Sequence, residues 1–439
     1  MSVLRCVVTQ VILAAMSDHS TTEFVIEPAG PLSGTVVIGG AKNSVLKLMA
    51  ATTMATGTHT IYNVPDIFDV GVMCRLLESM GAQTSRRPGV VEIVIGDIDP
   101  VAPFELVEQM RASTAVLGPL LGRFGRVEVG IPGGDDFGHR PIDMHLTGLE
   151  TLGATFETSP RGVIGRADKL TGGVVQLGFP SVGATENIMM AAVMAHGTTY
   201  IENAAREPEI ADLASMLNKM GAGITGSGTS TIRIEGVDEL EAVSHRVIPD
   251  RIQAATFLAA VGVSQGEILL EGARYDHMEM VCQKVGEMGL RTSPDRDGIW
   301  AMSNSRLRAV DLSTLPYPGV ATDYKPFLVA LLAVADGTSI VTENLFAGRF
   351  RYVDELVHLG AQIRTDGNHA VVRGVEQLSG AHVVSHDIRA GAALIVAALG
   401  AQGQTIVRDT GHVARGYPDL AGDLRSLGAN VIERPVEPV

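Results

Sequence analysis

The loop 133-GGDDFGHRP-141 combines two adjacent carboxylates with a histidine and an arginine. Its opening glycines allow a sharp turn, because glycine reaches positive φ without steric cost. Asp135 and Asp136 could donate or accept a proton, and Arg140 could bind an anion. We therefore expect a lid that carries a catalytic group over a bound anion, although a polar surface turn would have a similar composition.

Lys42 and Asn43 stand immediately before an apolar helix predicted at 44–55. Backbone N–H groups at such an end favour an anion. Asn43 could instead cap the helix. Lys42, however, opposes the helix dipole at a cost of a few tenths of a kcal/mol unless an anion joins it. The pair therefore indicates a bound anion.

Two further segments of the first half could contact such an anion. Arg111 lies in the largely apolar segment 110–125, where an arginine is either solvated or directed at a ligand. The turn Ser181-Val182-Gly183 leads into another apolar helix. Its N–H groups could hold a phosphate, or the turn could simply start the helix.

The second half places carboxylates and guanidinium groups where a strand gives way to a helix. These residues are Asp323, Arg349, Asp387, Arg389 and Arg415. A substrate with phosphate and carboxylate groups would need several arginines, because guanidinium binds such groups bidentately. Their equivalent positions in a repeat indicate one shared cleft.

The repeat that must position these residues is marked by two sets of glycines, each recurring about every 70 residues. One set closes an amphipathic helix: Gly81, Gly153, Gly221, Gly289, Gly360 and Gly428. The other opens a strand: Gly57, Gly125, Gly197, Gly266, Gly337 and Gly403. The first unit reads as helix 44–55, strand 58–64, helix 67–81 and strand 90–96. The pattern predicts an α/β fold of six units with parallel strand pairing.

Composition restricts the class of protein. The 439 residues are 46% hydrophobic and 19% charged, which predicts two or three globular domains. The net charge of −15 argues against nucleic-acid binding. Cys6, Cys74 and Cys282 match no zinc site or disulfide framework, which is typical of the cytoplasm. The apolar stretch 11–15 is too short to span a membrane, and Met16 could be the true start. We predict no metal and no cofactor.

Motifs in both halves resemble the enolpyruvyl transferases. They are 40-GAKNSVLKLMAA-51, 111-RASTAVLGPL-120, 131-IPGGDDFGHRPIDMH-145, 181-SVGATENIMMAAV-193, 203-NAAREPEI-210, 247-VIPDRI-252, 322-TD-323, 386-HDIRAG-391 and 415-RGY-417. The similarity runs in unbroken order from about residue 24 to 435 and is closest to members that act on UDP-N-acetylglucosamine in peptidoglycan (cell-wall) synthesis. It implies a two-domain inside-out α/β barrel. The domains would be 42–248 and 1–41 plus 249–439, with the active site in the cleft between them.

The resemblance also implies a reaction. Phosphoenolpyruvate loses phosphate as its enolpyruvyl group passes to a hydroxyl of a uridine nucleotide, through a tetrahedral ketal and then elimination. The implied catalytic residues are Lys42, Asp135, Asp323, Asp387 and Arg415. The implied substrate contacts are Asn43, Arg111, Arg140, Pro141, Ile142, Asp143, Met144, His145, Ser181, Val182, Gly183, Leu345, Arg349 and Arg389. Lys42, Arg140 and Arg415 would hold phosphoenolpyruvate. Asp323 would take the proton from the attacking hydroxyl, and Asp135 would donate one to the methylene carbon.

Four positions depart from the family pattern. Asp135 replaces the cysteine that fosfomycin alkylates in many members, and Ala115 replaces a tryptophan. Ala347 and Ala414 replace a glutamate and an aspartate on the side of phosphoenolpyruvate and the sugar. The leading acceptor is the 3-hydroxyl of UDP-N-acetylglucosamine.

Three alternatives stay open. UMP could be the acceptor, as in nikkomycin- or polyoxin-type nucleoside antibiotic biosynthesis. A shikimate-pathway transferase is disfavoured, because 140-RPIDMH-145 and 181-SVGATEN-187 resemble uridine-site segments. A catalytically silent nucleotide sensor is disfavoured by the joint retention of four residues: Lys42, Asp323, Asp387 and Arg415.

Overall fold

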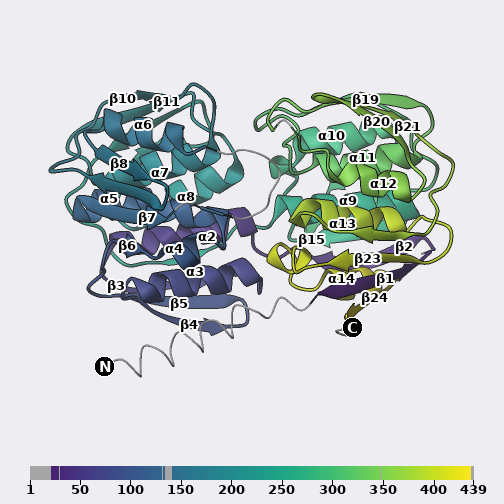
Figure 1. Cartoon of the computed structure of the whole chain (residues 1–439), viewed down its shortest axis with the longest axis horizontal. Coiled ribbons are helices and arrows are strands. Elements are labelled where there is room, and N and C mark those ends of the chain that lie inside the picture. Colours follow the sequence, from purple (N-terminus) through teal and green to yellow (C-terminus); the bar gives the residue numbers. More distant parts are fainter. Residues whose placement is uncertain (1–20, 29, 131, 134–140, 347, 437–439) are drawn as a thin grey trace.

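The computed structural model describes residues 21–28, 30–130, 132–133, 141–346 and 348–436. They form two lobes that lie side by side (Figure 1). The buried core of the first lobe lies within residues 41–247, and that of the second joins residues 24–38 to 252–431. Among the described residues, every helix is too short or too polar to cross a membrane.

Six four-stranded sheets are described, three in each lobe. In the first lobe the strand orders are β14(Ser244–Arg246)-β3(Gly57–Tyr62)-β5(Val90–Ile95)-β4(Gln83–Arg87), β6(Val101–Ala102)-β7(Arg126–Gly130)-β9(Gly162–Arg166)-β8(Thr155–Ser159) and β10(Val174–Gln176)-β11(Thr198–Glu202)-β13(Thr231–Glu235)-β12(Gly223–Thr225). In the second lobe they are β16(Arg291–Pro294)-β17(Gly298–Ser303)-β15(Gly266–Glu271)-β2(Leu32–Val37), β18(Leu312–Ser313)-β19(Thr338–Thr342)-β21(His369–Arg373)-β20(Gln362–Asp366) and β22(His382–Val384)-β23(Thr405–Asp409)-β1(Thr22–Glu27)-β24(Asn430–Pro435).

The predicted parallel pairing is right for one pair of strands in each sheet and wrong for the other two. The parallel pairs are β14–β3, β6–β7, β10–β11, β2–β15, β18–β19 and β22–β23. The remaining pairs are antiparallel, and in each of five sheets one of them joins strands that are linked by a short turn. Only Pro88 and Gly89, for example, connect β4 to β5, and a parallel crossover needs a dozen or more residues.

Three central helices in each lobe are covered by the other elements. They are α2(Lys42–Ala51), α5(Leu117–Phe124) and α7(Val182–Val193), and then α9(Arg251–Ser264), α11(Lys325–Val334) and α13(Ile388–Ala398). In α13 all eleven residues are buried, as expected of a helix that is apolar on every side. The start of each central helix is therefore the part that can present polar side chains.

The other helices each precede one of the helix-closing glycines, apart from the short α4(Phe104–Val107). They are α3(Phe68–Ser79), α6(Asp143–Thr151), α8(Pro208–Lys219), α10(Glu279–Met288), α12(Tyr352–His358) and α14(Leu420–Ser426). The six closing glycines have φ between 89° and 113°, where a side chain would be strained. The prediction that they end helices is confirmed.

The buried hydrophobic residues form two clusters, one within residues 41–247 and one that joins 24–38 to 252–431. The chain passes between the lobes at 38–41 and again at 247–250. These two crossings lie antiparallel, with the Ala41 N–H donating to the Ile248 carbonyl and the Asp250 N–H donating to the Gly39 carbonyl, both at 2.8 Å. A Cβ at Gly40 would lie 1.7 Å from the Asn63 carbonyl oxygen, so only glycine fits there.

Candidate active site between the lobes

The first turns of α2 and α9 meet where the chain crosses between the lobes. Asp250 caps α9, because its Oδ1 accepts the N–H groups of Ile252 and Gln253 at 2.7 and 3.0 Å. Its Oδ2 accepts the Lys42 N–H at 3.0 Å. The Asp250 carboxylate therefore accepts backbone N–H groups at the starts of both helices. The dipoles of α2 and α9 direct positive potential towards the interface between the lobes.

Lys42 and Arg415 are brought together by Asp69, although they come from different lobes. Lys42 Nζ lies 2.9 Å from Asp69 Oδ2, and Arg415 Nε donates to Oδ1 at 2.9 Å. Asp69 is fully buried at the start of α3, and Arg415 ends the 3₁₀ turn η4(Val413–Arg415). Burial raises the pKa of Asp69, but Lys42 and Arg415 outweigh it, and the net pKa is lowered. Lys42 and Arg415 thus both contact the ionised carboxylate of Asp69 at the interface between the lobes.

Asn43 lies inside α2, so the interpretation that it caps this helix is wrong. Ala41 is the N-cap residue and makes no side-chain cap. The Asn43 amide instead donates to Asp323 Oδ2 at 3.4 Å, across the interface. Arg349 holds Asp323 Oδ1 at 2.7 Å. Burial opposes ionisation of Asp323, but Arg349 and Arg389 lower its pKa well below the usual range. Asp323 is therefore ionised at neutral pH.

Asp387 and Arg389 open α13 next to this group. Asp387 caps the helix, because its Oδ1 accepts the N–H groups of Arg389 and Ala390, each at 2.8 Å. The guanidinium of Arg389 is buried and donates to the Tyr417 hydroxyl at 3.4 Å. Asp387 thus has a structural task, and the sequence signal for it is an aspartate directly before an apolar run. The catalytic role expected of Asp387 stays a prediction.

The predicted nucleotide-binding segments converge within the first lobe. Arg111, which opens the 3₁₀ segment η2(Arg111–Val116), donates to the Pro141 carbonyl at 3.4 Å. The Asn187 amide donates to His145 Nδ1 at 2.9 Å. A Cβ at Gly183 would lie 2.9 Å from the His145 ring, so the two segments touch. Burial, with Arg111 adding to it, lowers the pKa of His145 to about 4, and the imidazole is neutral at pH 7.

The remaining predicted nucleotide contacts flank this junction. Ser181 caps α7 by accepting the Ala184 N–H at 3.4 Å. Ile142 stands at the N-cap of α6, and Asp143 is exposed in its first turn. Val182 and Met144 are partly buried and pack against the core of the first lobe. These residues therefore lie at the first turns of two separate helices, α6 and α7.

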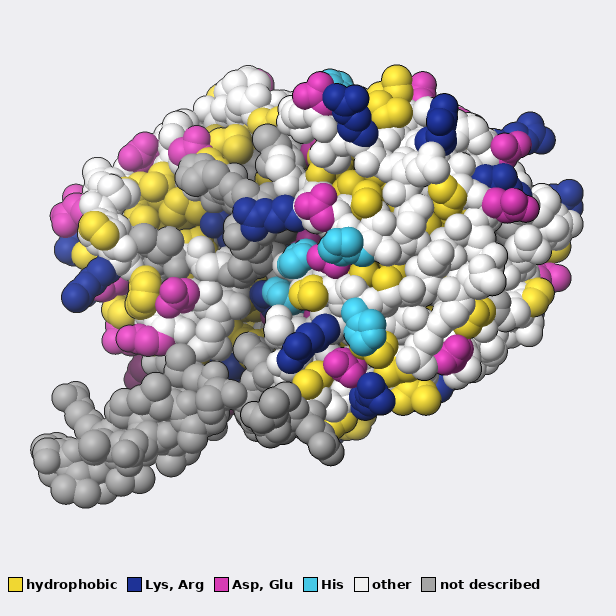
Figure 2. Space-filling model, turned by 45° about the vertical axis from the view of Figure 1, so that its right-hand side comes forward, with side chains coloured by type: hydrophobic (Ala, Val, Ile, Leu, Met, Phe, Trp, Pro, Cys, Tyr) yellow, Lys and Arg dark blue, Asp and Glu magenta, His cyan; other side chains and the backbone are white. Residues whose placement is uncertain are grey.

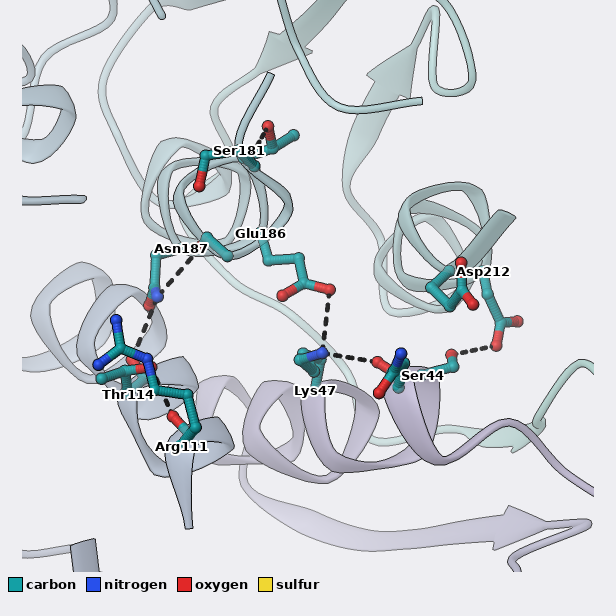
Figure 3. A network of polar contacts seen from close by, with 12 residues as sticks. Ser44, Lys47, Arg111, Thr114, Ser181, Glu186, Asn187 and Asp212 are labelled. Carbon is teal, nitrogen blue, oxygen red and sulfur yellow. Dashed lines mark hydrogen bonds and ion pairs between the residues drawn. The ribbon is translucent and has the colours of Figure 1, made fainter. Parts of the chain in front are cut away.

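A buried ion pair between Lys47 and Glu186 connects α2 to α7, as Figure 3 shows. Lys47 Nζ donates to the Asn43 carbonyl at 2.7 Å and lies 3.5 Å from Glu186 Oε1. Glu186 is 1% exposed on the first turns of α7. In the same view Ser44 donates to Asp212 Oδ2 at 2.5 Å. Polar contacts therefore tie α2 to both α7 and α8.

The lobes are also joined by residues that the sequence did not single out. Arg251 Nε lies 3.0 Å from Glu209 Oε1 on α8, and its NH1 donates to the Tyr324 hydroxyl at 2.9 Å. Arg251 and Glu209 are both buried. Neither Asp69 nor this pair could be identified from local patterns, because the partners are far apart in the chain. The only signal for Arg251 and Glu209 was their presence in the matching motifs 247-VIPDRI-252 and 203-NAAREPEI-210.

Two predicted residues, Asp135 and Arg140, lie outside the described residues, as does Ala347. Leu345 is described, and its N–H donates to Glu343 Oε1 at 2.8 Å. Acidic and basic side chains are interspersed over the face seen in Figure 2, and histidines gather near its centre. The electrostatic potential of this face therefore has no single sign. Recognition of an anion must then depend on individual buried cations.

Comparison with known proteins gives one family. The sequence profile described as EPSP synthase (3-phosphoshikimate 1-carboxyvinyltransferase) matches residues 26–424. A UDP-N-acetylglucosamine 1-carboxyvinyltransferase of Nocardia farcinica is 50% identical over 94% of this chain and 98% of its own length. The UDP-N-acetylglucosamine 1-carboxyvinyltransferase 1 of Caldanaerobacter subterraneus subsp. tengcongensis is 47% identical over 94% of this chain and 100% of its own.

A solved structure agrees in fold. The enolpyruvyl transferase NikO from Streptomyces tendae superposes with a TM-score of 0.85 at 26% identity, covering 95% of this chain and all of that one. The predicted inside-out α/β barrel is therefore confirmed, and its six units correspond to the six sheets described above. The chain belongs to the EPSP synthase family and is an enolpyruvyl (1-carboxyvinyl) transferase.

Proposed function

We propose that this enzyme transfers the enolpyruvyl group of phosphoenolpyruvate to the 3-hydroxyl of UDP-N-acetylglucosamine and releases phosphate. The observation that carries the proposal is the near half identity, over almost the whole of both chains, to relatives named for this reaction. The interface between the lobes supports it, because cations and an ionised carboxylate lie where both substrates could meet. The domain boundaries 42–248 and 1–41 plus 249–439 belong to the proposal, and the two hydrophobic clusters support them.

In this scheme Lys42 and Arg415 bind the phosphate and carboxylate of phosphoenolpyruvate. Asp69 holds both cations at a fixed separation, so less ordering is needed when the anion binds. Arg140 would complete the phosphoenolpyruvate site. Asp323 takes the proton of the sugar hydroxyl as it attacks, and Arg349 keeps that carboxylate ionised and oriented.

The uridine diphosphate binds beside α6 and α7. The N–H groups at the start of α7 and the guanidinium of Arg111 would hold its phosphates. His145 acts as a neutral spacer between the two helices, because its buried ring is already bound by Asn187. A place in the cytoplasm is part of the proposal, since Cys74 and Cys282 are both buried free thiols.

The experiment supplies phosphoenolpyruvate with UDP-N-acetylglucosamine, UMP or shikimate 3-phosphate and measures phosphate release. We expect release with UDP-N-acetylglucosamine and its loss in Asp323→Asn. Release with UMP alone would instead assign the enzyme to nucleoside modification. Calorimetry with adenine nucleotides is the specificity control, and equal affinity for them would contradict the uridine assignment.

A further inference from the structure

A second buried ion pair, formed by Lys325 and Glu343, lies in the interior of the second lobe, and Lys325 is two residues along the chain from Asp323. Lys325 is the first residue of α11 and is 0% exposed. Its Nζ lies 2.8 Å from Glu343 Oε2 and donates to the Arg349 carbonyl at 2.5 Å. The same ammonium stands 3.8 Å from the centre of the Phe350 ring. All three contacts are favourable for an ammonium, so its burial is compensated.

Glu343 follows β19, and its carboxylate accepts hydrogen bonds from the residues that lead to Arg349. Its Oε1 accepts the N–H groups of Leu345 and Phe346 at 2.8 and 3.2 Å, and the Thr314 hydroxyl at 2.7 Å. Its Oε2 accepts the Thr322 hydroxyl at 2.7 Å. A carboxylate with so many donors fixes the backbone around it, because each donor would be costly to leave unpaired.

The contacts continue without a break from this pair to Asp323. The Thr322 hydroxyl donates to Glu343 and accepts from Arg349 NH1 at 3.1 Å. Arg349 NH2 then donates to Asp323 Oδ1 at 2.7 Å. Lys325 holds the Arg349 backbone, while Thr322 holds the Arg349 side chain. A continuous set of contacts therefore links the buried pair to the Asp323 carboxylate.

We propose that Lys325 and Glu343 are positioning residues for the reaction: as a buried ion pair they fix the backbone at Leu345, Phe346 and Arg349, so that Arg349 holds Asp323 at the acceptor hydroxyl. The inference rests on the proposed function only in making Asp323 the base. It assigns a task to two residues that sequence motifs did not indicate.

The ion pair makes this arrangement sensitive to pH. The groups facing the Lys325 ammonium are Glu343, Arg349, Asp387 at the start of α13 and Tyr352 at the start of α12. Burial lowers the pKa of Lys325 to about 8, and Glu343 opposes that shift. Deprotonation above pH 8 removes one half of the pair. We therefore expect the rate constant kcat to fall on the alkaline side.

The test compares Lys325→Met and Glu343→Gln with the unmodified enzyme. Lys325→Met should lower kcat about 10-fold or more and abolish the alkaline limb, while KM for the nucleotide changes little. Glu343→Gln should move the limb to lower pH, because the group that raises the pKa of Lys325 is removed. Lys284→Met is the matched control, since Lys284 pairs with Glu287 at 2.7 Å on the surface of the same lobe. It should leave both kcat and the limb unchanged.

Hydrogen exchange of the Leu345 and Phe346 amides gives a reading that does not need turnover. Exchange should accelerate in Lys325→Met and stay unchanged in Lys284→Met. If the unmodified enzyme releases no phosphate with any acceptor, the proposed function fails while this result still tests the pair. Should Lys325→Met not fold, Glu343→Gln decides. An unmoved alkaline limb together with unchanged exchange in Glu343→Gln would overturn the proposal.

Discussion

Glu186 should make the stability of this protein depend on pH. Its carboxyl is 1% exposed, and its nearest cation, Lys47, lies 3.5 Å away. Oε1 accepts no hydrogen bond among the described residues. Burial raises the pKa of Glu186 from 4.5 to about 7, with Lys47 only partly opposing the shift. The folded state therefore holds this proton more tightly than the unfolded chain does.

The sign and size follow from the two pKa values. The folded state is penalised progressively as pH rises from 4.5 to about 7, and the full penalty is present above that range. A shift of one pKa unit corresponds to about 1.4 kcal/mol, so the penalty is about 3 kcal/mol at pH 8 and about 1 kcal/mol at pH 5. Glu186→Gln keeps the shape and removes the ionisation.

The assay is urea unfolding of Glu186→Gln and the unmodified protein at pH 5 and pH 8. The substitution also changes packing and leaves Lys47 unpaired, but such effects contribute at both pH values. The difference in the free energy of unfolding between variant and parent should therefore be about 2 kcal/mol more favourable to the variant at pH 8. Glu157→Gln, at an exposed strand position, measures the loss of a surface carboxylate. An equal change at both pH values in Glu186→Gln would refute the reasoning.

Three further predictions concern the site and the crossing. Asp69→Asn should reduce kcat/KM for phosphoenolpyruvate by about 10- to 100-fold, the scale of a charge-assisted hydrogen bond, as measured by phosphate release; unchanged kinetics would contradict its assignment. Gly40→Ala should lower the melting temperature because its Cβ would lie 1.7 Å from the Asn63 carbonyl oxygen, whereas Gly30→Ala meets nothing within 4 Å and should not. The unmodified enzyme should resist fosfomycin, because a carboxylate is a weaker nucleophile than a thiolate, and Asp135→Cys should become sensitive. Inactivation of the unmodified enzyme by fosfomycin would argue against this view of Asp135.

Local features of this fold could be predicted from sequence, and long-range ones could not. The helix-closing glycines were identifiable because positive φ is a property of one residue. Strand direction was mistaken for β5, because apolar periodicity does not reveal which neighbour a strand pairs with.

The same limit applies to the site. Lys42 and Arg415 were recognised as candidate anion ligands, yet Asp69, which joins them, gave no signal of its own. Arg415 and Asp69 are 346 positions apart, and no periodicity relates residues at that distance. Asn43 shows the converse case. Its type suggested a helix cap, but tertiary contact with Asp323 decided its place.

The strand order of the last sheet bears on how the protein is made. β1 pairs with β23 and β24, so the first described strand has its partners at 405–409 and 430–435. A ribosome that adds 5–20 residues per second needs roughly 20–80 s to proceed from β1 to β23. The first lobe can fold during that time, because its core is complete by residue 247. Until β23 and β24 have been synthesised, both edges of β1 are unpaired and can associate with other chains. A site that requires both lobes can therefore form only when synthesis is almost finished.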